Sequence, residues 1–243
     1  MDNLGALVGI LLCLYLVRTV QLKTVFLIAA VPSVAAVALV LKGVKENKSA
    51  STPLFKGLSA HKISADFKLF LFLSSLFSLG SFSYSFLLVF AGETGFSTPS
   101  LPLLYLAFTA AAFLSSVPFG KLADRAGRKN VLALSYVLWA MSCASFILAR
   151  GSHAAVIAAF ILYGLHKGAF DPVKTAFVSE LSHRDHRAGG LGFYQMVTGI
   201  CALPSSLIAG ILWDTAGKNA PFYLSLCLTL VSGFLLLFVR DTK

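Results

Sequence analysis

Three charged residues interrupt the apolar segment Ala154–Val178, and their spacing would bring them together. Asp171 comes four residues after Lys167 and three before Lys174, so on an α-helix one carboxylate would lie between two ammonium groups. If the segment crosses a membrane, charges at that depth are costly and are candidates for function. Two interpretations remain open: a substrate or proton pathway, or an internally neutralised structural cluster that faces other helices. Lys174 is close enough to the inner interface to extend towards it, which favours Lys167.

A second set of candidates lies in one short polar stretch, G-K-L-A-D-R-A-G-R-K at positions 120–129. Two uncharged runs, Leu101–Phe119 and Val131–Ala149, flank it. Its glycines would allow a tight reversal between two helices, and its cations would contact the anionic inner leaflet. A simple topology anchor would need no aspartate, so we interpret the stretch as a conformational latch, a charge network that holds one state and can break. The residues assigned to this latch are Gly120, Asp124, Arg125, Gly127, Arg128 and Lys129.

Polar side chains in two further apolar segments could line a cavity. Serines recur at positions 74, 78, 81 and 85 of the run Leu69–Ala91, so on one continuous helix they would share a face. Such a face could pack against other helices or form part of a substrate-facing wall. Ser78 and Ser81 are therefore pathway candidates, together with Gln195 in a later segment.

Catalytic and cofactor motifs are missing from the sequence. No nucleophile–base arrangement, phosphate-binding loop, haem motif or dinucleotide fingerprint is present. His183 and His186 are three residues apart, but no third ligand is positioned beside them, so we expect no metal site and no cofactor. The four cysteines fall inside apolar runs without C-x-x-C spacing and are interpreted as packing residues. The chain is not expected to be an enzyme.

The composition is that of a polytopic membrane protein. Hydrophobic residues make up 57% of the chain and charged residues 12%, and the mean hydropathy is +0.83. Soluble domains carry about 25% charged residues. The net charge of +10 comes from basic loops between apolar runs, where topology and lipid headgroups explain it, so no nucleic-acid partner is expected.

Eight apolar runs predict an all-α protein with eight transmembrane helices. The runs are Leu4–Val17, Thr24–Leu41, Leu69–Ala91, Leu101–Phe119, Val131–Ala149, Ala154–Val178, Gly189–Leu212 and Phe222–Val239. Lysines, serines and turn residues between the second and third runs indicate a domain boundary. The predicted organisation is a pair of helices at 1–43, a basic cytoplasmic linker at 44–66 and a six-helix unit at 67–243.

The distribution of basic residues predicts the orientation in the membrane. With the stretch 120–129 in the cytoplasm, fourteen of the 20 Lys and Arg residues fall in cytoplasmic loops or the C-terminal tail and four fall outside. This bias follows the positive-inside rule and places both termini in the cytoplasm. A bacterial or archaeal inner membrane is the expected location.

The stretch 120–129 with its following residues, G-K-L-A-D-R-A-G-R-K-N-V-L, resembles the loop signature of the major facilitator superfamily (MFS). The flanking segments are similar to the C-terminal half of bacterial drug- and metabolite-exporter-like members. The resemblance implies that residues 67–243 form the C-terminal six-helix half, and that Leu4–Glu46 corresponds to the fifth and sixth helices. The family fold has twelve helices, so the first four have no counterpart here. Two positions depart from the family pattern: Ile10 stands where an exporter motif has proline, and Pro172 where glycine often follows an acidic residue.

The resemblance implies a secondary transporter that moves a small solute by alternating access, as a proton-coupled exporter. The expected partners are the solute, membrane lipid, protons as coupling ion, and either a missing N-terminal half or a second copy. The alternative is a truncated, transport-inactive membrane protein that serves as a structural or assembly partner.

Overall fold

The computed structural model describes residues 2–43, 64–183 and 187–240, and over these residues every regular element is a helix. The chain divides into two units, Met1–Gly57 and Leu58–Lys243. The first unit contains α1 (Asp2–Thr19) and α2 (Leu22–Gly43), which are joined by two residues. Residues 44–63, most of the predicted linker, lie outside the described part.

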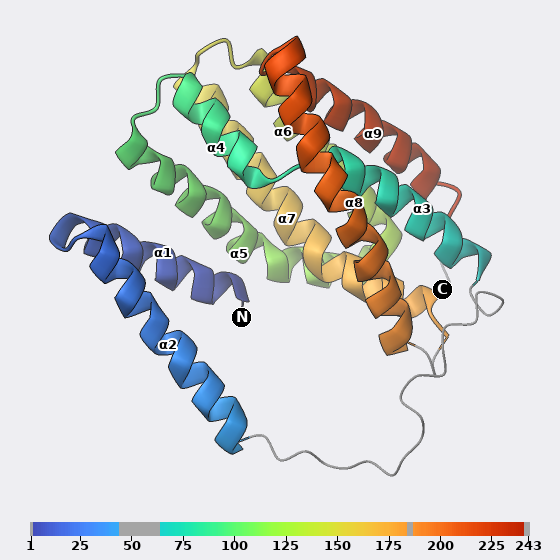
Figure 1. Ribbon diagram of the computed structural model, residues 1–243. Coiled ribbons are helices and arrows are strands. Elements are labelled where there is room, and N and C mark those ends of the chain that lie inside the picture. The colour runs from blue at the N-terminus through green and yellow to red at the C-terminus, as the bar shows by residue number, and fades with distance from the viewer. Residues whose placement is uncertain (1, 44–63, 184–186, 241–243) are drawn as a thin grey trace. The chain divides into compact units, whose positions relative to one another are not determined.

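The second unit is a bundle of helices (Figure 1). Its elements are α3 (Ala65–Gly80), α4 (Tyr84–Glu93), a short 3-10 helix η2 (Thr98–Ser100), α5 (Leu101–Ala126), α6 (Arg128–Leu148), α7 (His153–Leu181), α8 (Arg187–Ala216) and α9 (Ala220–Leu236). Six helical segments of the described chain are long and apolar enough to cross a membrane, counting α3 and α4 as one. Leu4–Leu16 and Ala220–Leu236 are shorter apolar helices. The prediction of an all-α polytopic protein is confirmed.

Helix α7 is the central element of the second unit. It packs along both α5 and α6 and also contacts α8, while α9 packs on α3 and α6. Two glycines one turn apart allow the close approach to α5. A Cβ added at Gly164 would collide with the Phe108 carbonyl, and one added at Gly168 would collide with the Ser115 hydroxyl. Because only glycine fits at these two positions, the α5–α7 pair is fixed by backbone contact.

An aromatic core holds the remaining helices together. Trp139 on α6 is fully buried, and its indole N–H donates to the Ser225 hydroxyl on α9 at 2.9 Å. Nearby, Phe146 stacks on Phe222 with ring centroids 5.0 Å apart, which is a second contact between α6 and α9. The buried polar residues of the described chain are serines, threonines and His166, with no Asp, Glu, Lys or Arg among them. Each charged side chain among the described residues of this unit is therefore at least partly exposed.

The third predicted span is interrupted. We expected one helix over Leu69–Ala91, but α3 ends at Gly80 and α4 begins at Tyr84, and Figure 1 shows non-helical chain between them. Ser83 provides the local cause, because its hydroxyl accepts a hydrogen bond from the Ser85 amide and so caps a new helix. The expectation that Ser74, Ser78, Ser81 and Ser85 share one helical face is therefore wrong.

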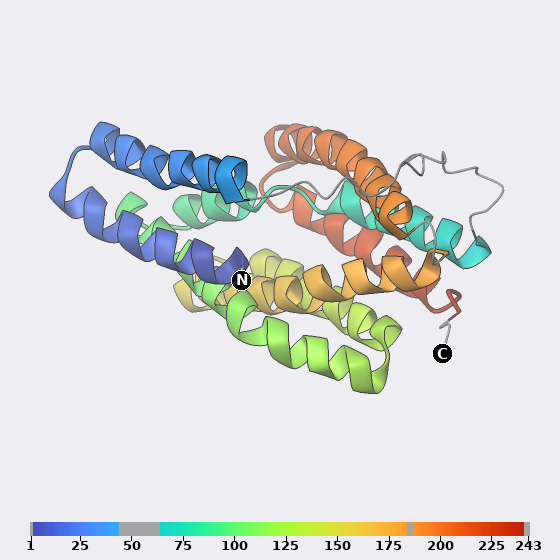
Figure 2. The same ribbon diagram turned by 90° about the horizontal axis from the view of Figure 1, so that it is seen from below.

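The polar stretch 120–129 is helical rather than a loop. Helix α5 continues to Ala126 and α6 starts at Arg128, so the reversal takes place at Gly127 (Figure 2). Gly127 has a φ of 94°, a conformation that favours glycine. Gly120 lies within α5 and does not contribute to the turn, which corrects its expected role. The apolar pattern stops at Phe119 because the last two turns of α5 are polar, although they remain helical.

Candidate functional site

The charged cluster on α7 is assembled as its spacing predicts. Asp171 lies between two lysines: its Oδ1 is 2.6 Å from Lys174 Nζ, and its Oδ2 is 3.5 Å from Lys167 Nζ. In the second unit the side chains of Lys167, Asp171 and Lys174 are 37%, 44% and 29% exposed. The neighbouring helices of the unit therefore leave this face of α7 partly open.

Lys174 is bound within α7, to side chains of the helix that carries it. Its ammonium group bonds Asp171 and lies 4.7 Å from the centroid of the Phe170 ring, a cation–π geometry. Side chains of a helix lean towards its N-terminus, so Lys174 reaches back along α7 to Asp171. Lys174 is therefore held by both Asp171 and Phe170, whereas Lys167 lies farther from the Asp171 carboxylate.

The opposite side of α7 is buried and aromatic. His166 is 2% exposed, and its Nδ1 lies 2.8 Å from the Ser135 carbonyl oxygen on α6, to which it donates. Its ring stacks on Phe170 and approaches Trp139. This packing fixes the rotation of α7 about its axis and so determines which face presents the charges.

The other pathway candidates have different surroundings. Ser78 donates its hydroxyl to the Thr198 carbonyl oxygen at 2.8 Å, which ties α3 to α8. Ser81 lies at the C-terminal end of α3 and is partly buried. Gln195 on α8 is exposed. Among the described residues, the ion pairs of the α7 cluster involve none of these three side chains.

The latch residues bind two different helix ends. Arg128 forms an ion pair with Glu180 on α7 at 2.9 Å and donates to the Ala176 carbonyl oxygen at 3.0 Å. Lys129 donates to the carbonyl oxygens of Leu237 and Val239, both at 2.7 Å, at the end of α9. Asp124 and Arg125 are exposed. The start of α6 is therefore bound to both α7 and α9.

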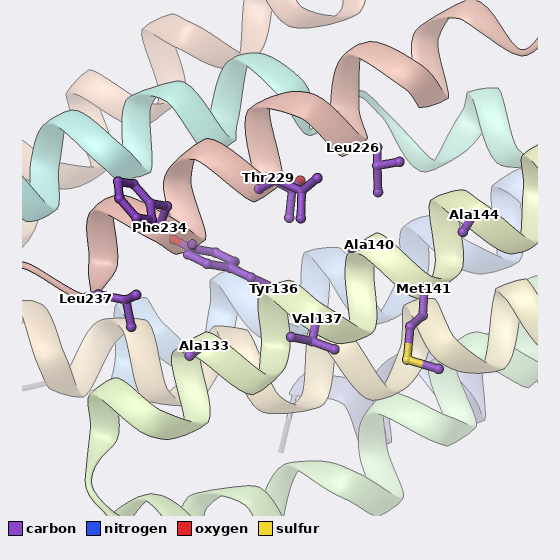
Figure 3. A pocket seen from close by; sticks show the side chains of 12 residues that line it. Ala133, Tyr136, Val137, Ala140, Met141, Ala144, Leu226, Thr229, Phe234 and Leu237 are labelled. Carbon is purple, nitrogen blue, oxygen red and sulfur yellow. The ribbon is translucent and has the colours of Figure 1, made fainter.

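An apolar groove lies between α6 and α9 (Figure 3). None of the described residues that line it belongs to α7. Its volume is about 510 Å³, and small residues such as Ala140, Ala144 and Gly233 form part of its wall. The polar groups that line it are limited to Tyr136 and Thr229. The groove is therefore almost entirely apolar, and no charged side chain of the described residues lines it.

Metal binding has no support in the described part of the chain. Across residues 2–43, 64–183 and 187–240, no group of three His, Cys, Asp or Glu side chains could hold a metal ion. His183 is described and His186 is not.

Two features of the site were missed by the sequence reasoning. Glu180 follows the predicted run Ala154–Val178, yet it lies in the last turn of α7 and pairs with Arg128. The close contact at Gly164 and Gly168 was not predicted, although the two residues form a G-x-x-x-G pattern beside Lys167. That pattern is a readable signal for helix packing in membranes.

Comparisons with known proteins agree with this architecture. The family model described as Major Facilitator Superfamily matches residues 69–243. An uncharacterized MFS-type transporter of Methanocaldococcus jannaschii is 34% identical over 98% of this chain and 61% of its own length. The transcription regulatory protein OpdE of Pseudomonas aeruginosa is 27% identical over 70% of this chain and 42% of its own. A probable chloroplastic anion transporter of Arabidopsis thaliana is 28% identical over 55% of this chain and 26% of its own length. The chain thus spans about three-fifths of the first relative's length.

Proposed function

This chain belongs to the Major Facilitator Superfamily, and from that premise we propose that it takes part in secondary active transport of a small solute by alternating access. It is a multi-pass integral membrane protein of a family that is not enzymatic. We further propose proton-coupled export across a cytoplasmic membrane, with both termini on the cytoplasmic side. The fourteen-to-four distribution of basic residues supports that orientation.

One observation carries the proposal: a charged cluster lies midway along α7, on a face that the second unit leaves partly open. Helix α7 runs from His153 to Leu181, so Lys167 is 14 residues from either end. At 1.5 Å per residue this position is about 21 Å from each end, close to the middle of a bilayer. A purely structural cluster would be covered by its own bundle, whereas these side chains are 29–44% exposed in the second unit.

The domain organisation that we propose follows from the family. The unit Leu58–Lys243 acts as a six-span half of the transporter, and α1 with α2 corresponds to the last two helices of the other half. Substrate sites in such folds lie between two repeats near the bilayer midplane. The face of α7 that bears Lys167 and Asp171 would then form one wall of the cavity.

The stretch at the α5–α6 reversal serves as the conformational latch in this proposal. Arg128 links α6 to α7, the helix that bears the cluster, through an ion pair in the last turn of α7. A charge pair that is partly exposed can break and re-form at small cost. Movement of α7 during transport would therefore act directly on this contact.

A second role remains a candidate, that of a transport-inactive structural or assembly partner. The open charged face favours it as well, because a partner chain or a second copy could cover that face. The two roles differ in one respect that can be measured: a transporter moves solute as the isolated chain, and an assembly partner does not.

The experiment is substrate-driven proton movement in vesicles that contain this 243-residue chain. A panel of small solutes is added while an internal pH dye is followed. Asp171→Asn is the variant, and Ser145→Ala, at a partly buried residue on α6, is the control. Proton movement in the wild type and the control, lost in Asp171→Asn, supports the proposal. No movement with any solute, from a chain that is folded in the vesicles, contradicts transport by this chain and favours the partner role.

A further inference from the structure

We infer that the solute of the α7 site is a small anion, and that Lys167 binds its negatively charged group. This inference rests on the proposed transport function and names the substrate class. It begins from the number of charges on one helix face. Two ammonium groups share a single carboxylate on α7, so the cluster carries one net positive charge.

Other residues of the second unit do not neutralise this charge at the same depth. In residues 64–183 and 187–240, the remaining Asp, Glu, Lys and Arg residues lie between helices or within five residues of a helix end. The nearest acid along α7 is Glu180 in its last turn, which pairs with Arg128. The adjacent ring, His166, bonds the Ser135 carbonyl oxygen on α6 and carries no carboxylate that could offset the excess charge. An excess cation in the middle of a membrane calls for an anionic partner.

The two lysines are not equivalent. Lys174 has a short bond to Asp171 at 2.6 Å and lies over the Phe170 ring, so its charge is used within the protein. Lys167 is 3.5 Å from the same carboxylate, beyond ordinary hydrogen-bond length, and its side chain is 37% exposed. Lys167 can therefore turn towards a solute while Lys174 keeps Asp171 paired.

The backbone of α7 at this point is held in place. Gly168, next to Lys167, lies against the Ala112 carbonyl and the Ser115 side chain of α5. Lys167 therefore projects from a fixed backbone, and only its flexible side chain needs to move. A fixed charge of this kind recognises a small carboxylate or phosphate group by electrostatics, and an uncharged solute or a cation gains nothing from it.

Thermal stabilisation of the purified 243-residue chain in detergent tests the inference without requiring transport. The probes are the sodium salts of acetate, lactate, benzoate, succinate and phosphate, with acetamide, lactamide and benzamide as uncharged matches and tetraethylammonium as the cation. Ionic strength is held constant with sodium chloride. We expect at least one anion to raise the unfolding temperature of the wild type, and its matched amide and the cation to leave that temperature unchanged.

Variants then locate the bound anion. Lys167→Gln should weaken the apparent affinity at least about tenfold, roughly the loss of one charged contact. Lys167→Arg should retain the anion response, and Lys121→Gln, which removes an exposed cation near the end of α5, should match the wild type. The inference is overturned if no anion stabilises the protein, if an amide or the cation stabilises it equally, or if the anion response survives in Lys167→Gln. If the inference is overturned but the vesicles transport a neutral or cationic solute, the proposed transport function still holds. Absence of transport of every solute contradicts the proposed transport function itself.

Discussion

Arg128 and Glu180 are joined across the second unit, with the guanidinium Nη1 2.9 Å from the carboxylate Oε2. The first residue of α6 thereby holds the last turn of α7. The same guanidinium nitrogen donates to the Ala176 carbonyl oxygen, which is one of the carbonyls near the helix end. The position after the Gly127 reversal is therefore a connection between helices as well as a turn.

Breaking this connection should affect conformation more than stability. The two side chains are 33% and 24% exposed, so solvent screens the pair, and Glu180→Gln should cost about 1 kcal/mol or less in unfolding free energy. Thermal unfolding of Glu180→Gln, Arg128→Ala and the double variant measures the coupling. Single-variant losses that add completely in the double variant would show that the pair contributes no interaction energy.

Asp124→Asn should lower the transport rate while the amount of protein in the membrane is unchanged. Asp124 is exposed near the end of α5, so loss of its charge should not disturb packing. Its proposed role is in the latch, which requires the charge. Transport rate and membrane abundance are compared with those of Lys121→Gln, a nearby exposed substitution. A transport rate equal to that of the wild type would refute the latch.

Glycine substitutions should separate the tight α5–α7 contact from the open α6–α9 groove. Gly168→Ala would place a methyl group against Ser115 and the Ala112 carbonyl, and such overpacking costs about 1–3 kcal/mol. Gly233→Ala would bring its Cβ only to 3.8 Å from Tyr136 Cδ2, an ordinary contact, and should be nearly neutral. Unfolding temperatures of the two variants in the same detergent are compared. Equal losses would contradict the packing described for α5 and α7.

Ser225→Ala should destabilise the aromatic core. It removes the acceptor for the buried indole N–H of Trp139, and a buried donor left without a partner costs about 1–3 kcal/mol. Ser145→Ala is the matched control, because Ser145 is only partly buried and its hydroxyl bonds the Met141 carbonyl oxygen of its own helix. Thermal unfolding and the fluorescence of Trp139, measured in a Trp213→Phe background, report the change. Identical unfolding temperatures for the two serine variants would contradict a structural role for the bond.

Much of the fold could be predicted because lipid imposes simple rules on a sequence. Uncharged runs of suitable length predicted the helices. The positions of Lys167 and Lys174, four residues before and three residues after Asp171, predicted the ion cluster that the structure contains. Helix ends were less predictable. Polar residues such as Lys121 end an apolar run without ending the helix, so α5 extends seven residues beyond the predicted Phe119.

The unpredicted features depend on contacts between distant residues. Sequence spacing within one helix could not show that Arg128 meets Glu180, 52 residues away, or that Lys129 meets α9. The apolar pattern around Gly80 favours one long helix. Ser83 instead caps the N-terminus of α4, and the helix is interrupted after Gly80. Apolar periodicity reports the environment of a segment and not its internal hydrogen bonding.

The two bonds from Lys129 to the end of α9 have a consequence for the order of assembly. Helix α9 has 17 residues and forms late, because α6 precedes it by about 70 positions of synthesis at roughly 5–20 residues per second. Lys129 has therefore been synthesised before Leu237 and Val239, the residues whose carbonyl oxygens it binds, leave the ribosome. In a pulse-chase experiment, Lys129→Gln should reach its protease-resistant form more slowly than Lys121→Gln. The start of α6 thus serves as the docking point at which the last helix completes the bundle.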